Sequence, residues 1–175
     1  MATFKIDATH SEIGFKIKHL VISTVSGNFS KFDATMECEN NDFTDAKVSF
    51  EANVDGITTG NAQRDEHLKS EDFFHAGEYP KIIFNSTSIE KKGDDEYTLH
   101  GDLSIRGVTK NIALKVEHGG SVIDPWGQSK EGFDISGKIS RKEFGLKWSA
   151  LTEAGGAVVS DDVRLIMSVQ MVKQA

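Results

Sequence analysis

The sequence alternates between apolar and polar residues along most of its length, and this alternation limits the possible folds more than any other feature. In residues 46–54, for example, Val48 and Phe50 share one phase, whereas Lys47 and Glu51 lie on the opposite phase. Neighbouring side chains of a β-strand point to opposite faces, so such a segment has one dry face and one solvated face. The pattern predicts strands at residues 13–19, 24–37, 46–54, 81–89, 97–105, 112–116, 133–139 and 163–171.

Short turn-forming connections separate the predicted strands, as at residues 91–96 and 153–158. Such turns favour antiparallel neighbours in an up-and-down order, because parallel pairing needs a long crossover. Within residues 24–37 the apolar phase shifts between Phe29 and Phe32, which predicts a β-bulge. We find no internal repeat and no second composition regime, so we expect one domain over residues 1–175.

Eight antiparallel strands that each need one face covered form either a sandwich or a closed barrel. The sequence has no long apolar helices to cover an open sheet, which favours an all-β fold, an eight-stranded antiparallel up-and-down barrel. Its charged residues lie on the outward phase, the inverse of an outer-membrane barrel. A barrel of this size is either filled by side chains or holds one small ligand. The alternation alone does not distinguish these two cases.

The balance of charge limits the partners. The net charge of −7 argues against nucleic acid or an anionic membrane surface as the main partner, because phosphate binding needs clustered Lys and Arg. No apolar run is long enough to span a bilayer or to form the core of a signal peptide. As written, the chain is therefore expected in the cytoplasm, and in the periplasm if it is a mature exported form.

Residues 61–74 interrupt the alternation between the third and fourth predicted strands. Asn61 is suited to cap a helix, and residues 62–69 are good helix formers, which predicts two or three turns of α-helix. Apolar Leu68 lies on this helix, and Phe73 and Phe74 follow it. We expect these three residues to gate the mouth of the barrel.

The same segment raises the question of a metal or catalytic site. Asp65, Glu66 and His67 are consecutive on the predicted helix, so they point about 100° apart and do not converge on one ion. The chain lacks His-Glu-x-x-His spacing, a nucleophile elbow, a phosphate loop and a dinucleotide fingerprint. We therefore expect no catalytic residues, no metal and no cofactor.

Several motifs, taken together, resemble the YceI-like polyisoprenoid-binding proteins, a bacterial family. The resemblance extends over nearly the whole chain. Its marks are "DATHSEIGFKIKH" at residues 7–19, "ITTGNAQRDEHLKSEDFF" at 57–74, "YPKIIF" at 79–84, "GDLSIRGVTK" at 101–110, "PWGQSKEGF" at 125–133 and "GGAVVSDDV" at 155–163, with Arg141, Phe144 and Gly145.

The resemblance implies a lipocalin-like eight-stranded barrel with a short helix, which carries or stores a long isoprenoid chain, a quinone-like lipid or a similar amphiphile in its interior. It also implies a homodimer. His19 is a candidate to hydrogen-bond a ligand oxygen, and Arg64 and Asp65 are expected to hold the helix on the barrel rim. The expected ligand-binding residues are Ile13, Phe15, Ile17, His19, Val48, Phe50, Leu68, Phe73, Phe74, Phe84, Leu103, Ile105, Phe133, Val163 and Leu165.

Two alternatives stay open. One is a ligand-free stress or interaction protein whose barrel is packed with its own Phe side chains. The other is a metal-dependent hydrolase built on Asp65, His67 and His75. A prenyl phosphate is a less favoured guest of such an acidic protein, unless Arg64 or Lys69 lies near the mouth.

Overall fold

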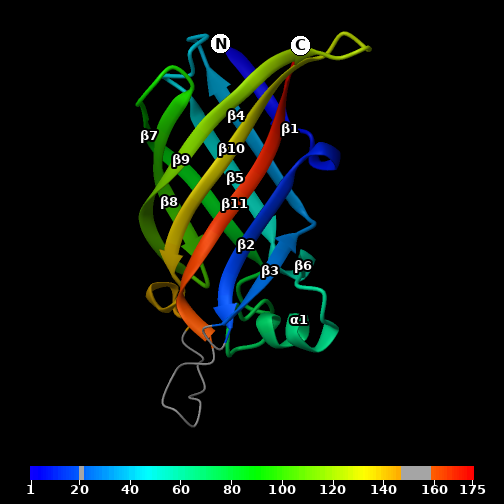
Figure 1. Cartoon of the computed structure of the whole chain (residues 1–175), viewed down its shortest axis with the longest axis vertical. Helices are drawn as coiled ribbons and strands as arrows, with labels where there is room; N and C mark the ends of the chain where they lie inside the picture. Colours follow the sequence, from blue (N-terminus) through cyan, green and yellow to red (C-terminus); the bar gives the residue numbers. More distant parts are fainter. Residues whose placement is uncertain (20–21, 147–158) are drawn as a thin grey trace.

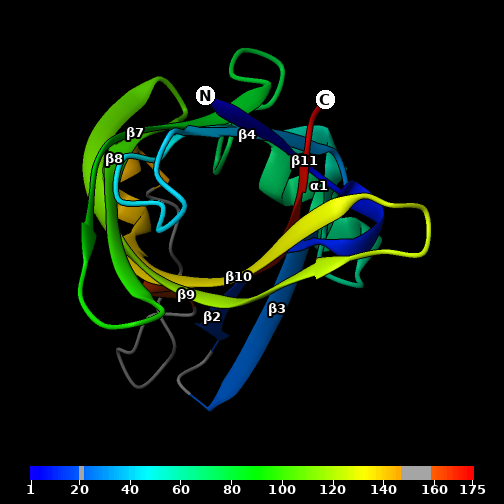
Figure 2. The same cartoon turned by 90° about the horizontal axis from the view of Figure 1, so that it is seen from above.

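The chain forms a closed antiparallel β-barrel, seen from the side in Figure 1 and along its axis in Figure 2. The computed structural model describes residues 1–19, 22–146 and 159–175. Its strands are β1 (Ala2–Ile6), β2 (Glu12–His19), β3 (Ser23–Phe29), β4 (Phe32–Cys38), β5 (Lys47–Asn53), β6 (Ile57–Thr58), β7 (Lys81–Lys91), β8 (Glu96–Ile105), β9 (Val108–Ile123), β10 (Ser129–Ser140) and β11 (Val159–Lys173).

The barrel has eight long strands, and two of them are each interrupted and so divided into two shorter strands. β1 and β2 form the first interrupted strand and are separated by the 3-10 helix η1 (Ala8–His10). β3 and β4 form the second interrupted strand. β1 pairs with β4, and β2 pairs with β3. The remaining long strands follow in chain order from β5 and β7 to β11. β11 closes the ring by pairing with both β1 and β2. The predicted eight-stranded up-and-down barrel is therefore confirmed.

The interruption between β3 and β4 shows that the predicted β-bulge is wrong. Residues 24–37 do not form one strand, because the backbone leaves the ladder at Ser30 and Lys31. Ser30 N donates to the carbonyl of Gly56 at 3.0 Å, and Asn53 N donates to that of Lys31 at 2.8 Å. These bonds go to the 3-10 helix η2 (Val54–Gly56) and to the end of β5, so the phase shift marks a junction between two strands.

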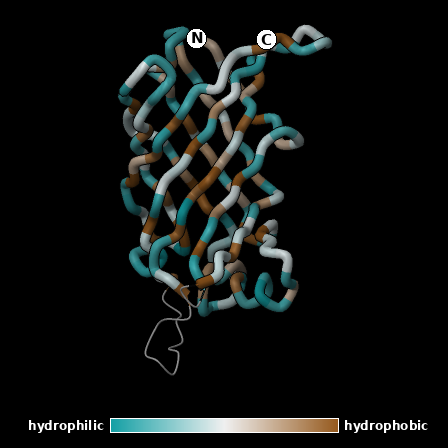
Figure 3. Tube along the Cα trace, viewed as in Figure 1, coloured by the Kyte–Doolittle hydropathy of each residue, from teal (hydrophilic) through white to brown (hydrophobic). Residues whose placement is uncertain are grey.

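The alternating apolar and polar residues of the sequence lie on the inner and outer faces of the barrel wall, respectively. Tyr97, Leu99, Leu103 and Ile105 of β8 point inward and are at most 6% exposed. Figure 3 shows the same alternation of hydrophilic and hydrophobic residues along the neighbouring strands. Strand β1 is an addition to the predicted set, and its Phe4 belongs to the same core.

The predicted helix is confirmed as α1 (Ala62–Lys69), which lies at the end of the barrel opposite the two termini (Figure 1). The side chain of Asn61 accepts a hydrogen bond from Arg64 N at 3.1 Å, so it caps the helix as expected. The last short helix, η3 (Arg141–Phe144), follows β10. Within the described residues, no helix combines the length and apolar character that crossing a membrane requires.

Candidate functional site: the barrel cavity

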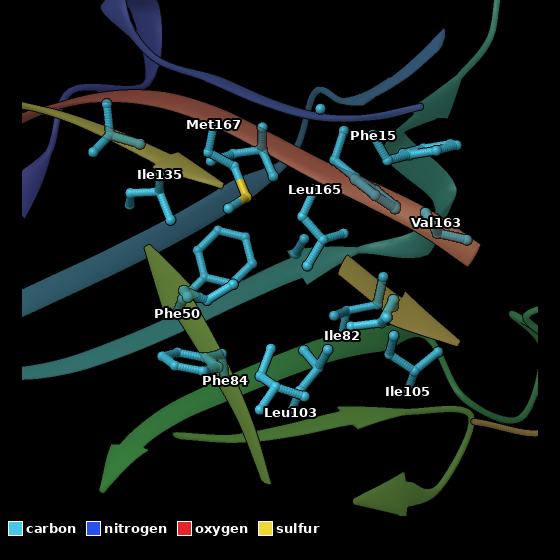
Figure 4. A pocket seen from close by; sticks show the side chains of 18 of the residues that line it. Phe15, Phe50, Ile82, Phe84, Leu103, Ile105, Ile135, Val163, Leu165 and Met167 are labelled. Atoms are coloured by element: carbon cyan, nitrogen blue, oxygen red, sulfur yellow. The ribbon is translucent and has the colours of Figure 1, made fainter. Parts of the chain in front are cut away.

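A cavity of about 600 Å³ occupies the interior of the barrel. Pockets for small molecules and cofactors span about 300–1,000 Å³, so this one is large enough for a ligand. Its wall is almost entirely aliphatic and aromatic. In the close-up of Figure 4, side chains from several strands point into one shared space, among them Phe50, Phe84, Leu103, Leu165 and Met167.

Glycines on the inward face help to keep the interior hollow. A Cβ atom placed on Gly27 would lie 2.2 Å from Cζ of Phe15, and one placed on Gly101 would lie 2.4 Å from Cζ of Phe84. Each phenyl ring therefore occupies space over a glycine of the neighbouring strand. The rings lie back against the wall, which leaves part of the interior unfilled.

The burial of the inward side chains agrees with a hollow interior. Phe15, Ile17 and Leu165 face the cavity, yet each keeps part of its surface free of protein contact. Side chains in a packed core bury nearly all of their surface against one another. This observation weighs against the packed-barrel alternative.

Phe43 closes the end of the barrel that carries both termini, which we call the upper end. It lies in the loop between β4 and β5, which turns inward in Figure 2. Its ring centroid is 5.3 Å from that of Phe133 and 6.5 Å from that of Tyr97. The Tyr97 hydroxyl donates to the carbonyl of Asp42 at 2.5 Å, and burial raises the pKa of this hydroxyl. Phe43 is 6% exposed, so the upper end is filled by aromatic side chains.

A polar cluster lies beside Phe43. His118 Nε2 is 2.7 Å from a carboxylate oxygen of Glu131, and the hydroxyl of Ser121 donates to the same oxygen. Serine, histidine and a carboxylate are the residue types of a hydrolytic triad. In a triad, however, the serine bonds to the imidazole. Here the serine bonds to the carboxylate instead, so this arrangement does not activate Ser121 as a nucleophile.

The cavity reaches the surface at the opposite end, which we call the lower end. Asn61 and Gln63 line the cavity and are exposed to solvent, and Arg64 and His67 of α1 line it beside them. Most of the polar lining is gathered at this end. Among the described residues, exposed polar side chains of the lining thus lie at the lower end.

Arg64 and Asp65 hold α1 to the rim, as predicted. Arg64 donates from Nε to Thr59 Oγ1 and from Nη2 to the Thr59 carbonyl, both at 2.7 Å. Asp65 Oδ1 accepts from Thr59 N at 2.8 Å and from Thr59 Oγ1 at 2.6 Å. Thr59 follows β6, which pairs with β3 in the barrel wall. Both side chains thus tie the first turns of α1 to the sheet.

The three expected gate residues lie at the lower end and line the cavity. Phe73 is 6% exposed, and its ring centroid is 5.1 Å from that of His67. Phe74 is half-buried, with its centroid 6.3 Å from that of Phe29 on β3. Leu68 packs against the same core. This placement agrees with a gate, and gating itself stays a prediction.

All of the predicted ligand-binding side chains line the cavity, including His19 at the end of β2. Whether they contact a ligand stays a prediction. Several lining residues are not in the predicted set although alternation places them on the inward phase, namely Ile82, Leu99, Ile135, Met167 and Val169. Phe43 has no such signal, because it comes from a turn with a φ of 63°.

The residues of the proposed metal site are engaged elsewhere. Asp65 binds Thr59, His67 Nε2 lies 2.8 Å from Asp72, and His75 lies 3.7 Å from Glu71. In the part of the chain that the structure describes, no group of three or more His, Cys, Asp or Glu side chains is arranged to hold a metal ion. The geometry gives the hydrolase alternative no support.

Comparison with known proteins identifies the family. A model described as the YceI-like domain matches residues 4–171. Protein YceI of Escherichia coli O17:K52:H18 is 39% identical over 175 residues, which cover 99% of this chain and 88% of that protein. The crystal structure of the Campylobacter jejuni YCEI protein is 34% identical, with a TM-score of 0.78 over 97% of this chain and 96% of that chain.

A third protein shares the fold at low sequence identity. It is a polyisoprenoid binding domain from Saccharophagus degradans, 14% identical, with a TM-score of 0.69 over 98% of each chain. The resemblance noted in the sequence motifs is thus confirmed by a family model and by full-length relatives. The chain belongs to the family of YceI-like domains.

Proposed function

We propose that the protein binds the hydrocarbon chain of an isoprenoid-type lipid inside its barrel, and carries or stores it. The observation that carries this proposal is the apolar cavity of about 600 Å³. Membership of the YceI-like family supports it, as does the likeness in fold to the polyisoprenoid binding domain from Saccharophagus degradans. The protein acts as a binder rather than as an enzyme.

The hydrophobic effect supplies the affinity in this proposal. Each CH₂ group moved from water into an apolar site contributes roughly 0.8 kcal/mol before the entropy of association is counted. Several isoprene units therefore bind without a specific polar contact along the chain. The aromatic closure at Phe43 limits how far a chain can extend toward the upper end, so selection acts on length and shape.

Native mass spectrometry of the purified protein, followed by extraction with organic solvent, tests this proposal. We expect a bound mass that the solvent removes and that is identified as a lipid with an isoprenoid chain. A protein that carries no lipid and takes up no added geranylgeraniol would contradict the proposal. The same spectrum also reports any stoichiometric metal.

A pair of variants locates the binding in the cavity. Phe50→Arg places a charge among apolar side chains in the middle of the wall, where Phe50 lies opposite Phe84 and Ala34 on the neighbouring strands. Burial of an unpaired charge is costly, so we expect uptake of geranylgeraniol to be abolished. Lys47→Glu changes a charge on the outward face of the same strand and is the matched control. It should bind as the wild type does.

A further inference from the structure

Arg64 is the feature of the cavity that hydrocarbon binding does not explain. A long apolar chain needs no cation, yet this side chain lines the cavity at its lower end. We propose that Arg64 binds the anionic head group of the guest, a phosphate or a carboxylate, so that the preferred ligand is an anionic amphiphile. This inference rests on the proposed function and names the class of its ligand.

The guanidinium group is fixed in place by the backbone and side chain of Thr59. Nε and Nη2 both donate hydrogen bonds of 2.7 Å to Thr59, so one edge of the planar guanidinium group is fixed against this residue. Its Nη1 has no hydrogen-bond partner among the described residues. The fixed group therefore keeps donors for a ligand, and guanidinium donors match the oxygens of carboxylates and phosphates.

The charge of Arg64 also has no direct counter-ion in the part of the chain that the structure describes. No carboxylate of the described residues lies within 4 Å of its nitrogens as an ion pair. Its neighbour Asp65 reaches it only through the hydroxyl of Thr59. The two other basic side chains of α1 have acidic partners. Lys69 Nζ lies 3.4 Å from Glu66, and His67 Nε2 lies 2.8 Å from Asp72.

Arg141, the second arginine of the lining, serves a different purpose. It is 2% exposed, and its three nitrogens donate to the carbonyls of Ser160, Leu146 and Val159. Those bonds join the turn after β10 to the start of β11. Arg141 is thus committed to backbone groups, whereas Arg64 stands beside the exposed amides of Asn61 and Gln63. The site at the lower end is built from Arg64 and its polar neighbours.

The inference is tested with pairs of ligands that share a chain and differ in the head group. Geranylgeranyl monophosphate is compared with geranylgeraniol, and palmitate with hexadecanol, by displacement of a fluorescent fatty-acid analogue. A charge-assisted hydrogen bond predicts that the wild type binds each anion about tenfold or more tightly than its alcohol. This preference should fall as salt is raised, because exposed charges are screened. The pair with the larger ratio identifies phosphate or carboxylate as the better head group.

Three variants assign the preference to Arg64. Arg64→Gln should bring the ratio of affinities close to one by weakening the anions far more than the alcohols, and Arg64→Lys should retain part of the preference. Lys69→Gln removes a cation of the same helix that does not line the cavity, and it should leave the ratio unchanged.

Two results would overturn the inference and leave the proposed function intact. One is a wild type that binds alcohol and anion equally. The other is an Arg64→Gln variant that weakens both ligands to the same extent, which would assign Arg64 to the structure of the rim alone. Failure of both alcohols and anions to bind would instead remove the proposed function, and the inference with it.

Discussion

The two ends of the barrel close in different ways. At the upper end, Phe43 packs among aromatic rings, and the nearby polar groups of His118, Ser121 and Glu131 bond to one another. At the lower end, a polar helix lies beside the exposed part of the lining, and Nη1 of Arg64 has no hydrogen-bond partner within the described part of the chain. The polar side chains of the upper end thus bond to one another, whereas at the lower end the described residues leave Nη1 of Arg64 without a hydrogen-bond partner. The contrast distinguishes an end filled by aromatic side chains from an end lined by exposed polar residues.

Truncation of the upper closure should have the largest effect. Phe43→Ala is expected to lower the free energy of unfolding by about 3–5 kcal/mol, as other buried Phe→Ala changes do. Urea denaturation measures this loss. Phe74→Ala at the lower end removes a half-buried ring and should cost less. Equal costs for the two variants would show that the ends do not differ in this way.

Acid should weaken a contact near the upper end. Hydrogen bonds from His10 and Thr9, and the Lys130 ammonium 3.0 Å away, hold the pKa of Asp7 far below its ordinary value of 3.8. A lowered folded-state pKa contributes stability that is present above the ordinary pKa and is lost as the pH falls below it. We expect urea midpoints to fall below about pH 4 in the wild type.

Asp7→Asn is the matched variant for this acid effect. It should lose about 1–3 kcal/mol at neutral pH, the usual contribution of hydrogen bonds to a charged group. Its urea midpoint should then depend less on pH in the acid range. A variant with the same acid slope as the wild type would assign the effect to other carboxylates.

The Gly27→Ala variant tests whether the ring of Phe15 borders the space that a guest occupies between the two ends of the cavity. The added methyl group would collide with the ring of Phe15, which must then move toward the cavity. Overpacking of this kind costs about 1–3 kcal/mol, and the narrower space should also weaken binding of geranylgeraniol. Gly77→Ala is the control, because among the described residues no heavy atom beyond its two chain neighbours lies within 4 Å of its added Cβ. Unchanged lipid affinity in Gly27→Ala would show that this ring does not border the guest.

The smallest effect is expected at the tip of the β9–β10 hairpin. This hairpin extends away from the barrel at the upper end (Figures 1 and 2), and its Trp126 is 84% exposed. Trp126→Ser should change the free energy of unfolding by less than about 0.5 kcal/mol. It should also leave lipid affinity unchanged, as measured by the same displacement assay. A weaker affinity would show that the hairpin takes part in binding.

The sequence predicts the wall of the barrel better than its ends. Alternation identifies the strands and the inward phase, since both depend on neighbours along the chain. The same pattern does not reveal that the ring of Phe15 lies over Gly27, because this depends on the register between β2 and β3. That cross-strand contact is part of the difference between a hollow and a filled interior.

The ends depend on contacts that local sequence patterns do not encode. Phe43 adopts a backbone conformation that is uncommon outside glycine, and rings from distant strands surround it. The helix cap at Asn61 is local, and it was predicted correctly. Arg64 matches the family signature, and its expected role in holding the helix on the rim agrees with its bonds to Thr59. That no acidic side chain of the described residues forms an ion pair with Arg64 emerges only once these side chains are placed in space.

The glycines behind the phenyl rings have an implication for engineering. At Gly27 the backbone hydrogen bonds belong to the ladder of the sheet, whereas the space above the glycine belongs to the ring of Phe15. At Gly101 a backbone carbonyl, that of Asn85, also borders this space. At Gly27 an added carbon therefore meets a side chain rather than the backbone, so the width of the interior can change there while the strands stay paired. A single substitution at this position should therefore give a barrel sized for a guest of smaller girth.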